Sequence, residues 1–179
     1  MELTVAITDP GYGDRVMKVN HAGEHGAVNI YAGQIFMARL TAPSLVDELR
    51  EFKSHEERHR TTFLAELTRR GRPRCRSYAL CGLGGLILGL VTATLGRRAI
   101  AATTVAVERV VLRHLVHQME VLRGRDPAAV AAIASIINEE QEHHDRSALH
   151  GQAGGFWPAV LMPLVSASTE LVIWSGMRL

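Results

Sequence analysis

The chain has 179 residues, of which 47% are hydrophobic and 21% are charged, and its formal net charge is +2. This length suits one domain with a full hydrophobic core, and the composition excludes a disordered or fibrous protein. So weak a positive charge gives no indication of a nucleic-acid-binding protein.

Glycine and proline residues divide the chain into predicted helices, and no segment of useful length alternates as a strand does. The breaks lie at 41–44, 71–73, 96, 124–127 and 151–158. The predicted helices span 14–41, 44–70, 77–95, 97–123, 127–150 and 156–176. Because the connections are short, we expect sequential helices to pack antiparallel in one domain over residues 1–179.

Two of these boundaries have recognisable capping signals. Ser44 and Asp47 have the spacing of an N-terminal capping box. Gly124 fits the end of one helix, and Asp126 followed by Pro127 fits the N-cap and first position of the next.

The N-terminal segment and the cysteines bear on the compartment. Residues 1–10 lack the basic start and long apolar stretch of a signal peptide, so we expect a cytoplasmic protein. Cys75 and Cys81 form neither a CxxC pair nor part of a zinc-like cluster. Free thiols are therefore expected, with a disulfide between the two as the alternative.

Four of the predicted helices carry an apolar stripe at helical spacing, and ionisable residues interrupt each stripe. These residues are Glu24 in 14–41, Glu56 and His59 in 44–70, Glu108 in 97–123, and Glu140 and His143 in 127–150. If the stripes face inward, four carboxylates enter one core, and burying even one unpaired carboxylate costs several kcal/mol. That is on the scale of a whole domain's stability, whereas two divalent cations would offset all four charges.

Two Glu-x-x-His motifs sharpen this prediction. In Glu56–His59 and in Glu140–His143 the two side chains lie one helical turn apart, so that they can share a metal ion. Two such motifs, with one glutamate from each of two other helices, are the pattern of di-iron carboxylate bundles. Six nitrogen and oxygen ligands favour iron over tetrahedral zinc, and manganese would also fit.

The register of the stripes is not unique. Segment 44–70 also offers His55 and Glu57, and segment 127–150 also offers Glu139, Glu142 and His144. The alternative interpretation is a solvated charged face on each of these helices.

The same residues resemble the demethoxyubiquinone hydroxylase family over nearly the whole chain from about residue 14. The matching segments are Asp14–Ala27, Ile30–Gln34, Glu56–His59, Thr92–Gly96, Ala106–Glu108 and Glu139–Asp145. The resemblance implies an all-α fold, a ferritin-like four-helix bundle with two additional helices, one of them apolar. It also implies a di-iron monooxygenase with two Fe ions, whose ligands match Glu24, Glu56, His59, Glu108, Glu140 and His143 one by one.

The family's reaction is the hydroxylation of the ring of a membrane-borne demethoxyubiquinone-type quinone, with O2 and electrons that come ultimately from NADH. Two other functions stay open for this chain. One is a ferritin-like iron-binding or iron-oxidising protein without an organic substrate. The other is a membrane-associated, quinone-binding family member with weakened catalysis.

Departures from the family pattern motivate the last alternative. His25 stands where the family usually has Tyr, and Arg109 where it usually has a second Glu. Leu115 follows His114 where the family often has Tyr, and it lies along the metal-facing stripe, seven residues after Glu108. A leucine there can donate neither a proton nor a hydrogen bond. Arg15 and His114 match family positions that could orient the site or the substrate.

Segment 77–96 contains no charged residue, and its 20 residues are long enough to span a bilayer. Its glycines and threonines make it only moderately apolar, and the glycines would allow close helix packing. We expect it to lie in the membrane interface or to cover the open end of the bundle. It follows five arginines that suit anionic headgroups, or else form a solvated turn beside a core helix: Arg69, Arg70, Arg72, Arg74 and Arg76.

These features predict a peripheral protein at the inner face of the plasma membrane. Its expected partners are the quinone and O2, together with a second copy of the chain or a biosynthetic complex.

Overall fold

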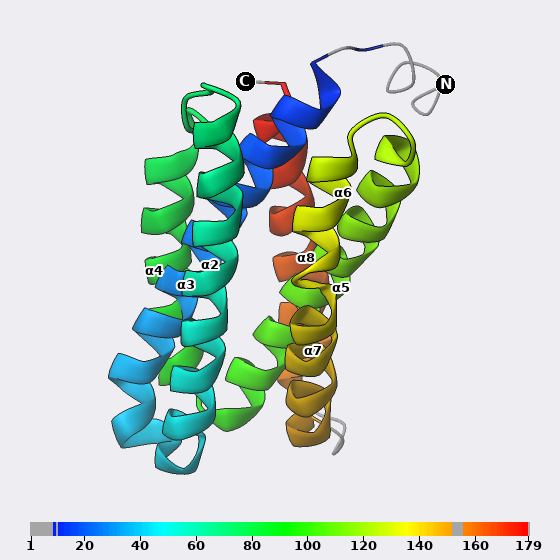
Figure 1. The fold of residues 1–179 in the computed structure, drawn as a ribbon. Coiled ribbons are helices and arrows are strands. Elements are labelled where there is room, and N and C mark those ends of the chain that lie inside the picture. Colours follow the sequence, from blue (N-terminus) through cyan, green and yellow to red (C-terminus); the bar gives the residue numbers. More distant parts are fainter. Residues whose placement is uncertain (1–8, 10, 152–155, 179) are drawn as a thin grey trace.

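The computed structural model describes residue 9 and residues 11–151 and 156–178. Every regular element in these ranges is helical, which confirms the predicted all-α class (Figure 1). The elements are α2 (Tyr12–Thr41), the short 3-10 helix η1 (Pro43–Leu45), α3 (Val46–Arg69), α4 (Tyr78–Thr94), α5 (Arg97–Leu122), α6 (Pro127–Ala134), α7 (Ile137–Gly151) and α8 (Phe156–Gly176).

The helices form a bundle in two halves. In one half α2 packs against α3 and α4, and in the other α5 packs against α7 and α8. Both α3 and α5 run antiparallel to α2 and are therefore parallel to each other (Figure 1). Helix α4, which follows α3 and precedes α5 in the sequence, returns the chain to the end of the bundle where α3 began, as a crossover connection. The antiparallel packing that was predicted for sequential helices is therefore seen in the α2–α3 and α5–α7 pairs.

Two large apolar clusters lie in the core, one near each end of α2. The first draws on α2, α3, α5 and α6 and includes Met17, Phe63, Leu67, Leu115 and Ile133. The second includes Tyr31, Ile35, Leu49, Phe52 and Ile100. The ionisable residues of the stripes on α2, α3 and α5 lie between the two clusters, because on each of these helices they fall between residues of the first cluster and residues of the second. The core therefore shields the middle of the bundle from water on both sides.

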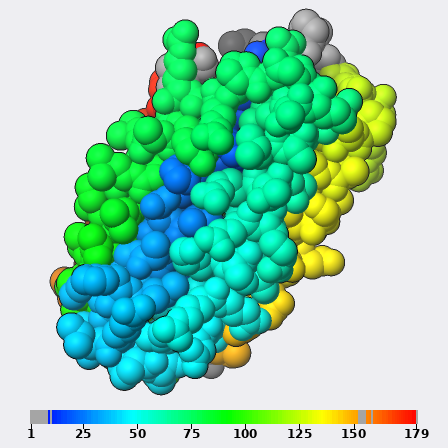
Figure 2. Space-filling model, turned by 60° about the vertical axis from the view of Figure 1, so that its left-hand side comes forward, coloured from blue at the N-terminus to red at the C-terminus, as the bar shows by residue number. Residues whose placement is uncertain are grey.

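The apolar helix α4 lies lengthwise against α2, with glycine facing backbone, and does not close the end of the bundle as one expectation had it. A Cβ atom on Gly85 would lie 2.3 Å from the carbonyl oxygen of Gly26, and one on Gly89 would lie 2.1 Å from that of Ile30. In Figure 2, α2 is visible as a blue strip between α4 in green and α3 in teal. The glycines of 77–96 thus permit close packing within the chain itself.

Most helix boundaries lie within about two residues of their predicted positions, but the capping box is wrong. Helix α3 begins at Val46 without a side-chain cap. Ser44 lies in η1, where its hydroxyl oxygen accepts a hydrogen bond from Arg97 at 2.5 Å, and Asp47 pairs with Arg50 at 2.8 Å.

The cap at Asp126 is confirmed, since its carboxylate accepts a hydrogen bond from the Ala129 amide at 3.0 Å. Gly124 has a φ of +74°, as expected for the glycine that ends α5.

The predicted helix 127–150 is interrupted, and its two parts are α6 and α7. The Ser135 hydroxyl donates a hydrogen bond to the Ala132 carbonyl at 2.8 Å. The Ile136 amide bonds to the Ile133 carbonyl at 3.2 Å, which is three residues back rather than four. A serine that competes for backbone groups in this way favours a local change of helix geometry.

Candidate metal centre

The structure brings the six predicted residues together midway along the bundle. They form two overlapping groups, in each of which the potential ligand atoms lie within 4.8 Å of one another. The groups are Glu24, Glu56, His59 and Glu140, and Glu56, Glu108, Glu140 and His143. None of the six residues is more than 6% exposed. Glu56 and Glu140 belong to both groups, so the two groups share these two carboxylates.

The ring nitrogens that face the centre are the Nδ1 atoms of both histidines. His59 Nδ1 lies 2.9 Å from Glu140 Oε1 and 3.5 Å from Glu56 Oε2. His143 Nδ1 lies 3.1 Å from Glu56 Oε1. These contacts are close, but they do not have the direction of hydrogen bonds.

Several buried atoms of the cluster therefore have no hydrogen-bond partner. They are both carboxylate oxygens of Glu56, Glu140 Oε1, His59 Nδ1 and His143 Nδ1. Leaving a buried polar atom unsatisfied costs about 1–3 kcal/mol, so a convergence of such atoms needs a common partner. Carboxylate oxygens and imidazole nitrogens are established metal ligands, and the residues present fit a pair of metal ions.

The pKa shifts of the clustered side chains also indicate a site that can bind cations. Burial raises the pKa values of Glu24 and Glu108 well above the usual carboxyl range, and the nearby Glu140 carboxylate raises them further. Burial also raises the pKa of Glu56, but contacts with His143 and His59 outweigh it and leave that pKa below its usual range. For His59, burial lowers the pKa, whereas contacts with Glu140 and Glu56 prevail and raise it to about 10. Protons thus offset part of the charge, and divalent cations that bound here would displace them.

The register alternatives fall into two sets. Glu57, Glu142 and His144 turn away from the centre and have partners on their own helices. Their contacts are Lys53 Nζ to Glu57 at 2.5 Å, Arg146 Nη1 to Glu142 at 2.9 Å, and His144 Nδ1 to Asp145 at 2.9 Å. The solvated-face interpretation therefore applies to these three residues and not to the six of the centre.

His55 and Glu139 behave differently, because each contacts one of the central histidines on the side away from the centre. Glu139 Oε2 lies 2.7 Å from His59 Nε2, and His55 Nδ1 lies 3.0 Å from His143 Nε2. Arg58 donates a hydrogen bond at 2.8 Å to the other oxygen of Glu139.

Tyr31 also reaches the centre, which the sequence reasoning missed by counting it only as part of an apolar stripe. Its hydroxyl donates a hydrogen bond to Glu108 Oε1 at 3.1 Å. Burial raises the pKa of Tyr31 well above its usual value, and the Glu108 carboxylate adds to this, so the hydroxyl keeps its proton. Its position, seven residues after Glu24 on the same stripe, was the available signal.

The residues carried over as orienting groups lie elsewhere. Arg15 pairs with Asp9 near the start of α2. His114 Nε2 lies 2.8 Å from a carboxylate oxygen of Glu170 on α8. Leu115 is buried in the first apolar cluster, with Phe63 and Met17. The orienting roles of Arg15 and His114 stay predictions.

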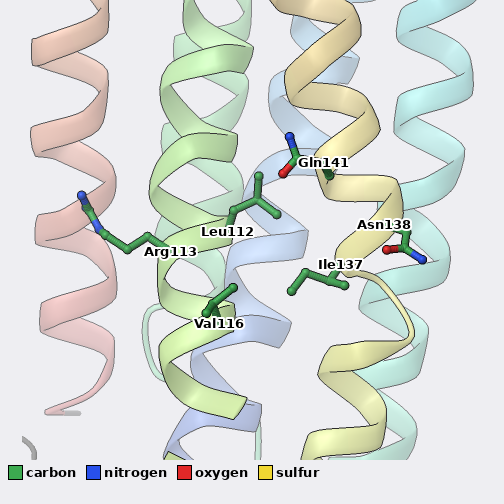
Figure 3. A pocket seen from close by; sticks show the side chains of 6 residues that line it. All are labelled: Leu112, Arg113, Val116, Ile137, Asn138 and Gln141. Carbon is green, nitrogen blue, oxygen red and sulfur yellow. The ribbon is translucent and has the colours of Figure 1, made fainter. Parts of the chain in front are cut away.

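A groove of about 410 Å³ runs between α5 and α7 on the outside of the centre. Figure 3 shows Leu112 and Val116 on α5 opposite Ile137 and Gln141 on α7, while Arg113 extends toward α8; Asn138 completes the lining. Leu112 lies one turn after Glu108, and Gln141 directly follows Glu140. The groove therefore borders the wall that carries these two ligand candidates, and no sequence pattern had indicated it.

Two Glu-x-x-His motifs and two single glutamates, buried in a helical bundle, define a carboxylate-rich centre that can hold metal. The family model for ubiquinone biosynthesis protein COQ7 matches residues 12–176, and the chain belongs to this family.

Curated relatives agree with this assignment. The chain is 36% identical over 168 residues to a 3-demethoxyubiquinol 3-hydroxylase of Rhodospirillum rubrum, covering 92% of this chain and 77% of the relative. It is 34% identical over 171 residues to the human mitochondrial NADPH-dependent 3-demethoxyubiquinone 3-hydroxylase, covering 93% and 77%. It is 31% identical over 182 residues to the mitochondrial 5-demethoxyubiquinone hydroxylase of Saccharomyces cerevisiae, covering 93% and 78%.

Proposed function

We propose that this protein is a di-iron monooxygenase that hydroxylates the ring of a demethoxyubiquinone-type quinone, using O2 and electrons from NADH. The observation that carries the proposal is the pair of overlapping ligand groups, which share Glu56 and Glu140, in a chain of the COQ7 family. The crossover helix between α3 and α5 supports a ferritin-like arrangement of the bundle. Its ligands would be the four glutamates and two histidines of those groups.

One oxygen atom of O2 converts a ring C–H bond to C–OH, and the other atom leaves as water. NADH supplies the two electrons and, with one proton from solvent, the two hydrogens of that water.

The bound iron pair would supply the activation of O2, which protein side chains cannot achieve alone. The chain's own residues prepare the place where this happens. The two apolar clusters exclude water from the middle of the bundle, and Tyr31 fixes Glu108 by donating a hydrogen bond. The groove beside Leu112 and Ile137 gives an apolar quinone ring a way to approach α5 and α7.

The test combines metal analysis with turnover. We expect purified protein to contain about two iron ions per chain and to oxidise NADH only when a demethoxyquinone is added. With ¹⁸O2, one labelled atom should appear in the quinone. NADPH is tested in parallel, because the human relative is named as NADPH-dependent.

Glu108→Ala should lower both iron content and turnover, whereas Glu142→Gln, which changes an outward-facing acid, should alter neither. Unchanged iron content and turnover in Glu108→Ala would refute the ligand assignment. Quinone-independent iron oxidation with many ions per chain would favour a storage protein instead.

Peripheral membrane contact is a further part of the proposal, and exposed apolar side chains support it. On α4 and the end of α2 these are Leu80, Leu83, Ile87, Val91, Phe36 and Leu40. Within the described residues, the helix that is long and apolar enough to cross a membrane is α8, through Ala159–Gly176, which is 17% buried. The 17-residue α4 is shorter, so α8 joins 77–96 as a candidate for lipid contact.

The basic segment before α4 contributes less than its five arginines suggested. Arg69 and Arg70 pair with Glu66, and Arg70 also pairs with Asp126. The side chain of Arg70 is only 11% exposed, so the expectation that it meets headgroups is wrong.

Vesicle flotation tests the membrane contact. The protein should float with vesicles that contain anionic lipid, and Leu83→Glu should reduce the floating fraction. Leu149→Glu, on the equally exposed surface of α7, is the matched control. Equal flotation of all three proteins would rule out contact through α4.

A further inference from the structure

The residue that precedes each Glu-x-x-His motif contacts the histidine of the other motif. Glu139, which directly precedes Glu140 of the α7 motif, contacts the α3 histidine His59 at 2.7 Å. His55, which directly precedes Glu56 of the α3 motif, contacts the α7 histidine at 3.0 Å. Each motif is thus better described as five residues long, with a first residue that contacts the histidine on the other helix.

Both contacts are made through Nε2, which leaves Nδ1 of each histidine facing the centre. A histidine that binds metal through one ring nitrogen needs a proton on the other, and a hydrogen-bond acceptor fixes that tautomer and the ring orientation. A carboxylate acceptor also increases the electron density that the imidazole offers to the metal.

The two halves of this crossed arrangement are chemically unequal. His59 has a carboxylate behind it, and Arg58 holds that carboxylate at 2.8 Å. Behind His143 lies only the imidazole ring of His55, which is a neutral acceptor. Glu139 Oε2 lies 3.9 Å from the His55 nitrogen that makes this contact. Glu139 is therefore next to both contacts but directly supports only His59.

Glu139 is not itself placed as a ligand. It belongs to neither group of converging atoms, its side chain is 35% exposed, and its oxygens face His59 Nε2 and Arg58. Its proximity to Glu140 in sequence does not bring it to the inner face of α7.

We propose that Glu139 is a positioning residue that orients His59 and strengthens it as a ligand, so that the ion held by Glu24, Glu56, His59 and Glu140 binds more tightly than its neighbour. This inference rests on the proposed metal centre and adds to it a difference in affinity between the two ions.

The test is an anaerobic titration of the metal-free full-length protein with Co²⁺, whose visible absorption reports ligand geometry. Wild type should bind two ions in two steps. Glu139→Gln keeps an acceptor but removes the charge, and it should weaken the tighter step by about 10- to 100-fold, with a shifted cobalt spectrum. Glu139→Ala should weaken it further, and Glu142→Gln should match wild type.

The possible results distinguish a failure of the proposed function from a failure of this inference alone. If wild type binds no Co²⁺ or Fe²⁺, the proposed function fails and this inference with it. If wild type binds two ions and Glu139→Gln matches it in affinity and spectrum, only the inference fails. If Glu139→Gln binds a single ion, Glu139 is a ligand and the positioning role is overturned. Thermal unfolding of the metal-free variants should equal that of wild type, whereas a merely structural role would lower it.

Discussion

His21 is completely buried, and neither of its ring nitrogens has a hydrogen-bond partner. It stacks on Tyr78, with 4.9 Å between the ring centroids. Burial lowers the pKa of His21 to about 4, and the positive charges of Arg74 and Arg60 contribute to this. The folded protein therefore keeps this histidine neutral where an unfolded chain would protonate it.

This difference predicts a dependence of stability on pH. Between pH 6.5 and about 4 the unfolded state binds a proton that the folded state does not, so the free energy of unfolding falls as the pH is lowered. Above pH 6.5 the contribution is constant. His21→Phe, which keeps the ring stacking, should remove up to about 3 kcal/mol of this decline, as measured by urea unfolding at several pH values. Parallel pH profiles for the two proteins would contradict the prediction.

At the residue scale, helical periodicity placed on the interrupted stripes all six residues that the structure brings together, although it left the register of the stripes on α3 and α7 open. Burying a carboxylate or an imidazole costs free energy that a binding partner must offset, and a shared metal site explained the interruptions in all four stripes. Periodicity could not decide what His55 and Glu139 do, because each lies one residue off its stripe. Only the side-chain contacts between α3 and α7 show that they lie behind the histidines. Tyr31 was missed because an apolar stripe hides the polar end of a tyrosine.

At the scale of helices, the contact between α2 and α4 gives a sharp prediction. Gly89→Ala would place a methyl group 2.1 Å from the backbone carbonyl oxygen of Ile30, and backbone cannot move aside as a side chain does. The helices must separate, which should lower the free energy of unfolding by about 1–3 kcal/mol.

Gly84→Ala is the control, because a Cβ there meets nothing within 4 Å. It should stabilise the helix by about 0.5–1 kcal/mol, since alanine favours helix over glycine. Chemical denaturation of both variants measures the difference, and equal effects would show that α4 is not held closely against α2.

The sequence predicted where helices begin and end better than what they contact. An uncharged, glycine-rich segment fits lipid or another helix equally well. Nothing in the composition of 77–96 indicates that its glycines face backbone carbonyl groups of α2. The break at Ser135 was missed because alanine and isoleucine continue the helical pattern across it. The capping box failed because Ser44 bonds to Arg97, a residue 53 positions away.

At the scale of the whole molecule, the bundle is two helical units with the centre between them. Removing the metal should weaken this junction first, because the converging buried atoms then lose their common partner. We expect chelator-treated protein to unfold at a lower temperature and to lose amide protection near Glu56 and Glu140 before the α2–α4 contact opens. Hydrogen exchange with and without added Fe²⁺ measures this order, and uniform loss of protection would contradict it.

The ligand candidates divide evenly between the two units. Glu24, Glu56 and His59 come from α2 and α3, whereas Glu108, Glu140 and His143 come from α5 and α7. Each group of four draws on both units, so neither unit can complete a group by itself. Under the proposed function, metal binding therefore depends on correct docking of the two units, because a chain whose units pack out of register offers no complete set of donors.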